Sequence, residues 1–172
     1  LEGILAANDK QMRALKDNLS QALNAFEGRG LTIEQKNGKV YVSMENKLLF
    51  KSGSWSVNDE GRNAVVELGK VLATNPDISV LIEGHTDNDK VLGNLGDGVQ
   101  NNWDLSTKRA LAIVSILTEN ASIDKKNLTA AGRSEYAPLM SNSSTEGKAK
   151  NRRIEVILTP NLDKINDMLN QL

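Results

Sequence analysis

The sequence predicts an α/β sandwich: a mixed β-sheet of βαβαβ type with helices packed on one face and a further helix at each end. Three observations support this fold class. A hairpin pattern occupies residues 31–44, helical and strand patterns alternate between residues 59 and 131, and an alternating strand pattern covers residues 151–158. We therefore expect an N-terminal helix at 1–28, one domain at 29–160 and a tail helix at 161–172.

Composition limits the classes of function. Of the 172 residues, 39% are hydrophobic and 25% charged, as in ordinary soluble domains. The net charge of −1, without a block of like charge, argues against nucleic acid as a partner. Cysteine is absent, which excludes disulfides, thiolate metal sites and cysteine nucleophiles.

No apolar run approaches the roughly twenty residues of a membrane span, and charged residues at positions 2, 9 and 10 interrupt any signal peptide. Because the chain lacks an initiator methionine, we expect a fragment whose targeting segment has been removed. Any link to a membrane would then lie upstream of Leu1.

The N-terminal helix is predicted by apolar residues that recur every three or four positions from Met12 to Phe26, with Gly28 as the stop signal. Two interpretations remain open. The helix either docks on the domain, or it is the end of a coiled-coil stalk that would make the protein a dimer.

A β-hairpin is predicted next. Residues 31–35 and 40–44 alternate between apolar and polar side chains, and Asn37-Gly38 between them is a strong type I′ turn signal. We expect residues 47–50 to add a short strand.

The remaining elements follow from apolar periodicity and from capping residues. They are a helix at 59–73 capped by Asn58 or Asp59, a strand at 78–82, a helix capped by Asp104, a strand at 128–131, a helical turn at 146–150, a strand at 151–158 and a short helix after Pro160. In the last strand Ile154, Val156 and Leu158 face inward, and Arg153, Glu155 and Ile157 face outward.

Residues 79–110 carry the polar groups of greatest interest. A buried strand presents His85, Thr86 and Asp87 at its end, and the following helix offers Asn102 and Arg109. An aspartate can accept hydrogen bonds from an ammonium group while an arginine clasps a carboxylate, so the pair could hold the head group of an amino acid. The alternative is a plain Asp87–Arg109 salt bridge between strand and helix, and residue types alone do not choose between the two.

Enzyme classes find little support, and we expect no catalytic residue, no metal and no cofactor. His85 is the only histidine, and we expect it to lie on the same strand face as Asp87 and to orient a loop. The chain has no Gly-x-Ser-x-Gly elbow and no His-x-x-x-His spacing for zinc. The glycines of the loop at 88–101 do not follow a phosphate-binding fingerprint.

Four segments together resemble one family. Gly84-His-Thr-Asp87, Asn102-x-x-Leu-Ser-x-x-Arg-Ala110, Gly132 with Pro138, and Gly147-x-Ala-x-Asn-Arg-Arg-Ile-Glu155 occur in the order of the motifs of the OmpA-like peptidoglycan-binding domain family. This family includes the OmpA C-terminal domain, Pal and MotB. The similarity extends over residues 40–159, most of the chain.

The resemblance implies non-covalent binding of the diaminopimelate residue of the peptidoglycan stem peptide. The ligand-binding residues would be Asp87, Arg109, Asn102, Thr86 and Arg152. Supporting residues from the same motifs would be Gly84, His85, Leu105, Asn151 and Arg153.

The family also implies a role and a location. The domain would anchor an outer-membrane protein or lipoprotein to the cell wall in the periplasm of a Gram-negative envelope. The alternative is an assembly module whose terminal helices drive oligomerisation, with wall binding secondary.

Two departures from the family pattern stand out. The loop between Asp87 and Asn102 is longer than usual, and Gly53 and Ser54 lie in a loop where many relatives carry an asparagine at the ligand.

Overall fold

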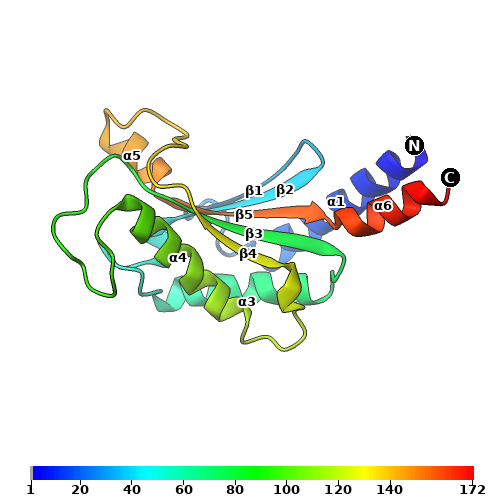
Figure 1. Cartoon of the computed structure of the whole chain (residues 1–172), viewed down its shortest axis with the longest axis horizontal. Helices are drawn as coiled ribbons and strands as arrows, with labels where there is room; N and C mark the ends of the chain where they lie inside the picture. The colour runs from blue at the N-terminus through cyan, green and yellow to red at the C-terminus, as the bar shows by residue number, and fades with distance from the viewer. Residues whose placement is uncertain (1) are drawn as a thin grey trace.

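The computed structural model describes residues 2–172, without the side chains of Leu162 and Lys164; Leu1, the first residue of the predicted N-terminal helix, lies outside the described residues. Its centre is a five-stranded mixed sheet in the order β1-β2-β5-β3-β4. Figure 1 shows this sheet edge-on with helices below it. The predicted α/β sandwich is confirmed.

The strands are β1 (Leu31–Lys36), β2 (Lys39–Glu45), β3 (Ile78–His85), β4 (Leu128–Gly132) and β5 (Arg153–Pro160). The pairs β1–β2, β2–β5 and β5–β3 are antiparallel, and β3–β4 is parallel. The predicted hairpin is confirmed, because Asn37 and Gly38 connect β1 to β2 with φ angles of 52° and 74°. Both values lie in the left-handed region that a type I′ turn requires.

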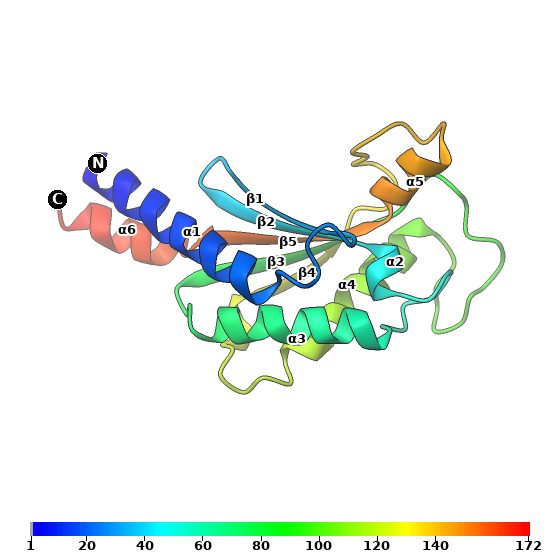
Figure 2. The same ribbon diagram turned by 180° about the vertical axis from the view of Figure 1, so that it is seen from behind.

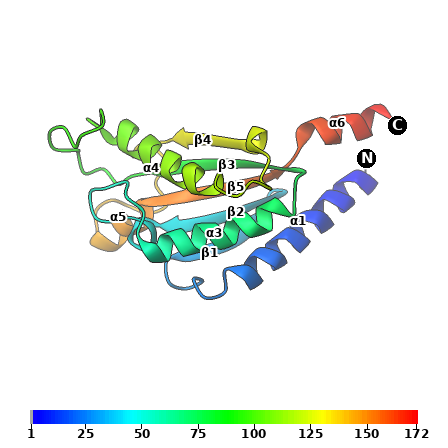
Figure 3. The same ribbon diagram turned by 90° about the horizontal axis from the view of Figure 1, so that it is seen from below.

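Three helices, α1 (Glu2–Ala22), α3 (Asp59–Ala73) and α4 (Asn102–Leu117), cover one face of the sheet (Figure 3). Asn58 caps α3 by accepting a hydrogen bond from the amide of Gly61. The core between helices and sheet is mostly aliphatic, because the chain has few aromatic residues. Its fully buried members include Leu15, Leu19, Val42, Met44, Leu68, Ile82, Ile113, Ile154, Val156 and Leu158.

The short strand predicted at 47–50 is wrong. Residues Asn46–Leu49 form a single helical turn, α2, and Phe50 makes only an isolated bridge to Val57. The apolar run carries no helical periodicity over so few residues, so the pattern could not distinguish the two states. The turn directs Leu48 and Leu49 into the core, where they are 4% and 0% exposed.

The other helices are the 3₁₀ helix η1 (Lys125–Asn127), α5 (Thr145–Asn151) and α6 (Leu162–Asn170). Figures 1 and 2 show both chain termini together at one end of the molecule, with α5 and the loop that precedes α4 at the opposite end. Within residues 2–172, none of the helices has the length and apolar character needed to cross a bilayer.

The N-terminal helix is docked along its second half. Met12, Leu15 and Leu19 are at most 1% exposed, and α1 contacts β1, β2 and α3. Its first turns project beyond the sheet, where Leu5 is 60% exposed. The docked interpretation therefore describes the second half of α1, and dimerisation through the helix stays a prediction.

Candidate functional site

Two glycines let α4 lie unusually close to the sheet. A Cβ at Gly84 would stand 2.0 Å from the carbonyl oxygen of Ser106, and one at Gly132 would stand 2.1 Å from Thr107 Oγ1. Neither distance is sterically allowed for a real side chain, so glycine is required at both positions. This close packing brings the first turns of α4 against the end of β3.

The start of α4 differs from the predicted one. Asn101, not Asp104, is the N-cap, and its side chain accepts a hydrogen bond from the Asp104 amide at 2.9 Å. Both residues are good caps, so sequence alone did not fix the boundary. The earlier start places Asn102 in the first turn of α4 and, as predicted for a helix that reaches this far, on the same side as Arg109 seven residues later.

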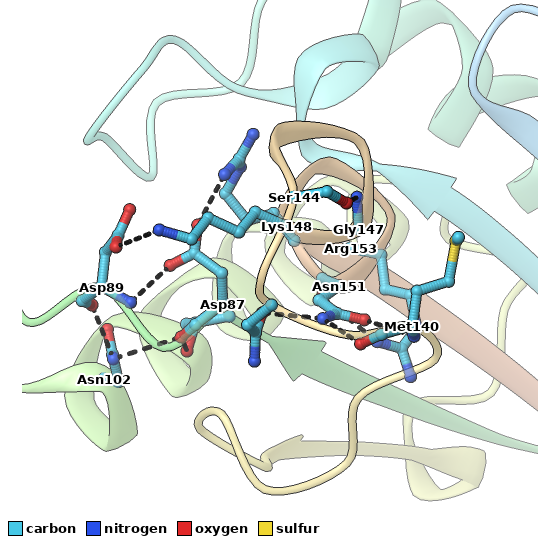
Figure 4. Close-up of polar contacts among 12 residues, drawn as sticks. Asp87, Asp89, Asn102, Met140, Ser144, Gly147, Lys148, Asn151 and Arg153 are labelled. Atoms are coloured by element: carbon cyan, nitrogen blue, oxygen red, sulfur yellow. Dashed lines mark hydrogen bonds and ion pairs between the residues drawn. The ribbon is translucent and has the colours of Figure 1, made fainter.

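Asn102 ties the helix to the chain that leaves β3. Its Nδ2 donates to the carbonyl oxygens of Asp89 (2.9 Å) and Asp87 (3.4 Å), as Figure 4 shows. Asn102 is 9% exposed. The amide side chain therefore fixes the backbone on either side of residue 88.

Arg109 is buried with unused donors. It is 5% exposed, its Nε donates to the carbonyl oxygen of Ser54 at 2.8 Å, and its guanidinium carbon lies 5.4 Å from the Phe50 ring centroid. Among the described residues, neither terminal Nη group has a hydrogen-bond partner. Burial lowers the pKa of Arg109 to about 10, Asp87 acts to raise it and Arg152 to lower it. The guanidinium is therefore charged at neutral pH.

Asp87 is 5% exposed and pairs with Arg152. Arg152 Nη1 donates to Asp87 Oδ2 at 2.5 Å, and the Asp89 amide donates to Asp87 Oδ1 at 2.9 Å. A direct Asp87–Arg109 ion pair is not present among the described residues. The arrangement therefore places one carboxylate and two guanidinium groups close together, with Arg109 left available.

Thr86 supports the backbone at this point. Its hydroxyl donates to the Asp87 carbonyl oxygen at 2.8 Å, and its amide donates to the Ser134 carbonyl oxygen at 2.9 Å. Ser106 Oγ in turn accepts from the Ser134 amide at 3.1 Å. Leu105, from the same motif as Ser106, is 7% exposed and packs inward.

The long loop at 88–101 is anchored at both ends. Lys148 Nζ in α5 donates to Asp89 Oδ1 at 2.7 Å (Figure 4), and Val99 is 1% exposed near the start of α4. Sequence reasoning missed both Asp89 and Lys148, since neither belongs to a motif that signals an ion pair across fifty-nine residues.

Asn151 and Arg153 hold the segment that runs from β4 to α5. Asn151 is fully buried; its Oδ1 accepts from the amides of Leu139 (2.8 Å) and Met140 (3.0 Å), and its Nδ2 donates to the Met140 carbonyl oxygen at 2.8 Å. Arg153 donates to Glu155 Oε1 at 2.7 Å and to the carbonyl oxygens of Asn151 and Ala137.

His85 lies on the sheet face that the helices leave open. Its Nε2 lies 3.1 Å from Glu83 Oε1, and both residues line a groove of about 330 Å³ with Arg153 and Glu155. The expectation that His85 and Asp87 share one strand face is wrong, because β3 ends at His85 and strand alternation stops there. Within the described residues, no group of three His, Cys, Asp or Glu side chains could hold a metal ion.

Comparison with known proteins identifies relatives of the chain. Residues 49–152 match the model of the OmpA family. Motility protein B of Bacillus subtilis is 35% identical over 119 residues, which cover 69% of this chain and 44% of that protein. YiaD of Escherichia coli, which is named a probable lipoprotein, is 29% identical over 152 residues, which cover 88% of this chain and 63% of that protein. The chain thus spans about half the length of these curated relatives.

Solved structures share the fold. A MotB-like protein from Desulfovibrio vulgaris superposes with a TM-score of 0.80 at 21% identity, covering 91% of this chain and 95% of that one. The cell wall anchor of the T6SS from Pseudomonas aeruginosa gives a TM-score of 0.73 at 30% identity, covering 83% and 96%. The superposition on the Desulfovibrio vulgaris structure establishes the fold. The Pseudomonas aeruginosa structure adds a relative of comparable size.

Proposed function

We propose that this chain, which belongs to the OmpA family, binds peptidoglycan non-covalently through the free amino-acid end of the diaminopimelate residue. The ligand carboxylate would be held by Arg109 and the ligand ammonium by Asp87, with Asn102 and Thr86 fixing the backbone around them. Arg152, which donates to Asp87 Oδ2, would contribute beside that carboxylate.

One observation carries the proposal: a buried, charged arginine whose terminal donors are unused. The side chain as a whole is buried, yet among the described residues the Arg109 Nη atoms are not found with the fully buried polar atoms that lack a partner, so these donors reach solvent and are open to a ligand. Arg109 donates only through Nε. Its two Nη groups match the spacing of a carboxylate, which they can bind through two parallel hydrogen bonds.

Asp87 supplies the complementary charge. Each of its oxygens accepts one hydrogen bond, and an ionised carboxylate has about four lone-pair sites. A ligand ammonium can therefore bind Asp87 without displacing Arg152. Together the two side chains distinguish an amino-acid head group, which carries both charges, from a simple anion or cation.

The arrangement of the molecule suits an anchor. The candidate site lies at the end that carries α5, and the two chain termini lie at the other end (Figure 2). A wall-bound ligand would thus not compete for space with whatever adjoins the termini. We infer a periplasmic domain that attaches an envelope protein, either an outer-membrane protein or a lipoprotein, to the cell wall without catalysis.

Calorimetric titration with a diaminopimelate-containing muropeptide tests the proposal. Asp87→Ala leaves the ligand ammonium without its carboxylate partner, and Arg109→Ala leaves the ligand carboxylate without its guanidinium partner. Each variant should therefore weaken binding by about 2–5 kcal/mol. Arg62→Ala is the matched control, since Arg62 is a surface residue of α3 paired with Glu119, and it should bind as the wild type does. Unchanged affinity in both site variants would exclude this site.

A second candidate function is assembly through the terminal helices. Leu5, Met168, Leu169 and Leu172 are 60%, 37%, 38% and 85% exposed at the end that carries both termini. Deletion of α1 would remove core residues, so a substitution is the better test. If these side chains form an interface, Leu5→Asp should shift a sedimenting dimer to monomer; a wild-type monomer at all concentrations rules assembly out.

A further inference from the structure

Asp89 lies two residues beyond Asp87 and is bound from three sides. Its amide donates to Asp87 Oδ1 at 2.9 Å, its carbonyl oxygen accepts from Asn102 Nδ2 at 2.9 Å, and its carboxylate accepts from Lys148 Nζ at 2.7 Å (Figure 4). We propose that Asp89 determines how well the candidate site binds an ammonium group, because it holds Lys148 away from Asp87. This inference rests on the proposed function, in which Asp87 binds the ligand ammonium.

Helix α5 brings two cations to the end of β3. Lys148 and Arg152 are four residues apart, and the Arg152 amide donates to the Lys148 carbonyl oxygen at 3.0 Å, so the two residues lie one helical turn apart. Arg152 Nη1 pairs with Asp87 at 2.5 Å, and Lys148 Nζ pairs with Asp89 at 2.7 Å. Two cations one turn apart thus meet two carboxylates two residues apart, each with its own partner.

Lys148 lies within reach of Asp87. Asp89 contacts Lys148 through its carboxylate and Asp87 through its amide, so a single residue separates the two charged groups. A lysine side chain is a flexible four-carbon stem that ends in three donors. Asp87 accepts one hydrogen bond at each oxygen and has further lone-pair sites. Without the charge of Asp89, we expect the Lys148 ammonium to turn to Asp87.

A lysine bound to Asp87 would occupy the place of the ligand. Lys148 and the free amino end of diaminopimelate both present an ammonium group, so the two compete for the same carboxylate. Arg109 and Arg152 already act on each other and on Asp87 as charged neighbours. A third cation at this carboxylate would also repel the ligand ammonium. Asp89 prevents both effects because it pairs with Lys148.

The exposure of the Asp89–Lys148 pair separates this role from a structural one. The side chains of Asp89 and Lys148 are 65% and 30% exposed, and an ion pair this open to water adds little to the stability of the fold. The contacts of Asp89 with Asp87 and Asn102 are made by its backbone. Asp89→Asn therefore removes the charge and keeps these two hydrogen bonds.

Calorimetric titration of the full chain with a stem tripeptide that contains diaminopimelate tests the inference. Asp89→Asn should weaken binding about two- to fivefold, the factor that corresponds to one exposed ion pair. Lys148→Met should bind at least as tightly as the wild type. The double variant Asp89→Asn with Lys148→Met should regain the wild-type affinity, because the competing ammonium group is gone.

Lys150→Met is the matched control, since Lys150 is a lysine of the same helix that pairs with Glu45. Added to Asp89→Asn, it should restore no affinity. A second tripeptide contains 2-aminopimelate, which keeps the terminal carboxylate and lacks the terminal amino group. Asp89→Asn should bind this peptide no more weakly than the wild type does, because Lys148 then has no ligand ammonium to compete with.

Three results would overturn the inference and leave the proposed function standing. Equal weakening in Asp89→Asn and Lys148→Met would mean that the pair acts as a structural tie. A loss in Asp89→Asn that persists in the double variant would mean that Asp89 itself contacts the ligand. Wild-type affinity in Asp89→Asn would mean that Lys148 does not compete. If the wild type does not bind the diaminopimelate tripeptide, the proposed function fails and the inference fails with it.

Discussion

Arg109 and Arg153 are buried to nearly the same degree, 5% and 4% exposed, but their donors are used differently. Arg153 lies on the open face, where Nε donates to Glu155 and both Nη groups donate to backbone carbonyl oxygens. Arg109 belongs to α4, on the other side of the sheet, and uses only Nε within the described residues. A buried arginine whose donors are all used has none left for a ligand, whereas one with unused donors can still bind an anion.

The largest expected effect is on the free energy of unfolding, and it comes from removing Arg153, the arginine whose donors are all used. Arg153→Met leaves the Glu155 carboxylate without its guanidinium partner and removes donors from two carbonyl oxygens, so it should lower the free energy of unfolding by about 3–5 kcal/mol. Urea denaturation measures this. The double variant Arg153→Met with Glu155→Met should recover much of the loss, because no buried charge is then left unpaired. A loss below about 1 kcal/mol in the single variant would contradict the assignment.

The next effect couples fold and site. In Gly84→Ala the new methyl group would meet the Ser106 carbonyl oxygen at 2.0 Å, so α4 must move away from β3. We expect a loss of about 1–3 kcal/mol in unfolding free energy, together with weaker muropeptide binding because α4 carries Arg109. Gly3→Ala serves as the control, since a Cβ at Gly3 in α1 meets no atom within 4 Å. Normal binding by Gly84→Ala would show that the position of α4 does not determine how Arg109 meets the ligand.

The smallest effect concerns the pH dependence of stability, and it should leave ligand binding by Asp87 and Arg109 unchanged. The hydrogen bond from His85 lowers the pKa of Glu83 below its usual 4.5, against burial, with Arg133 and Arg153 also lowering it. A lowered pKa stabilises the fold above the unfolded-state value and this contribution is lost as the pH falls. Glu83→Gln should therefore cost about 1 kcal/mol at neutral pH, and the difference from wild type should shrink below pH 4.5. If the stability difference between wild type and Glu83→Gln grew as the pH fell, the pKa of Glu83 would be raised in the folded state and not lowered.

The fold was largely predictable because its signals are local. Asn37-Gly38 determines the β1–β2 hairpin through backbone conformation alone, and the alternation in β5 orients Ile154, Val156 and Leu158 toward the core. Residues 47–50 show the limit. Four residues carry too little periodicity, and tertiary packing of Leu48 and Leu49 decides that they form α2.

The candidate site was predictable only as a set of residues. The motifs placed Asp87, Asn102, Arg109 and Arg152 together, but the partners of each depend on contacts across the fold. Arg152 pairs with Asp87 over sixty-five residues, and Arg109 uses a carbonyl oxygen fifty-five residues away. Likewise, Arg153 was expected to face outward and does face away from the helices, yet it is buried because its guanidinium binds the Ala137 carbonyl oxygen in the segment after β4.

A ligand–protein double-mutant cycle tests the central claim most directly. Wild type and Arg109→Ala are each titrated with a stem peptide containing diaminopimelate and with the same peptide containing lysine, which keeps the side-chain ammonium and lacks the carboxylate. The wild type should favour diaminopimelate by about ten- to a hundredfold, and Arg109→Ala should bind the two peptides equally. If Arg109→Ala keeps the preference for diaminopimelate, Arg109 is not the group that binds the ligand carboxylate.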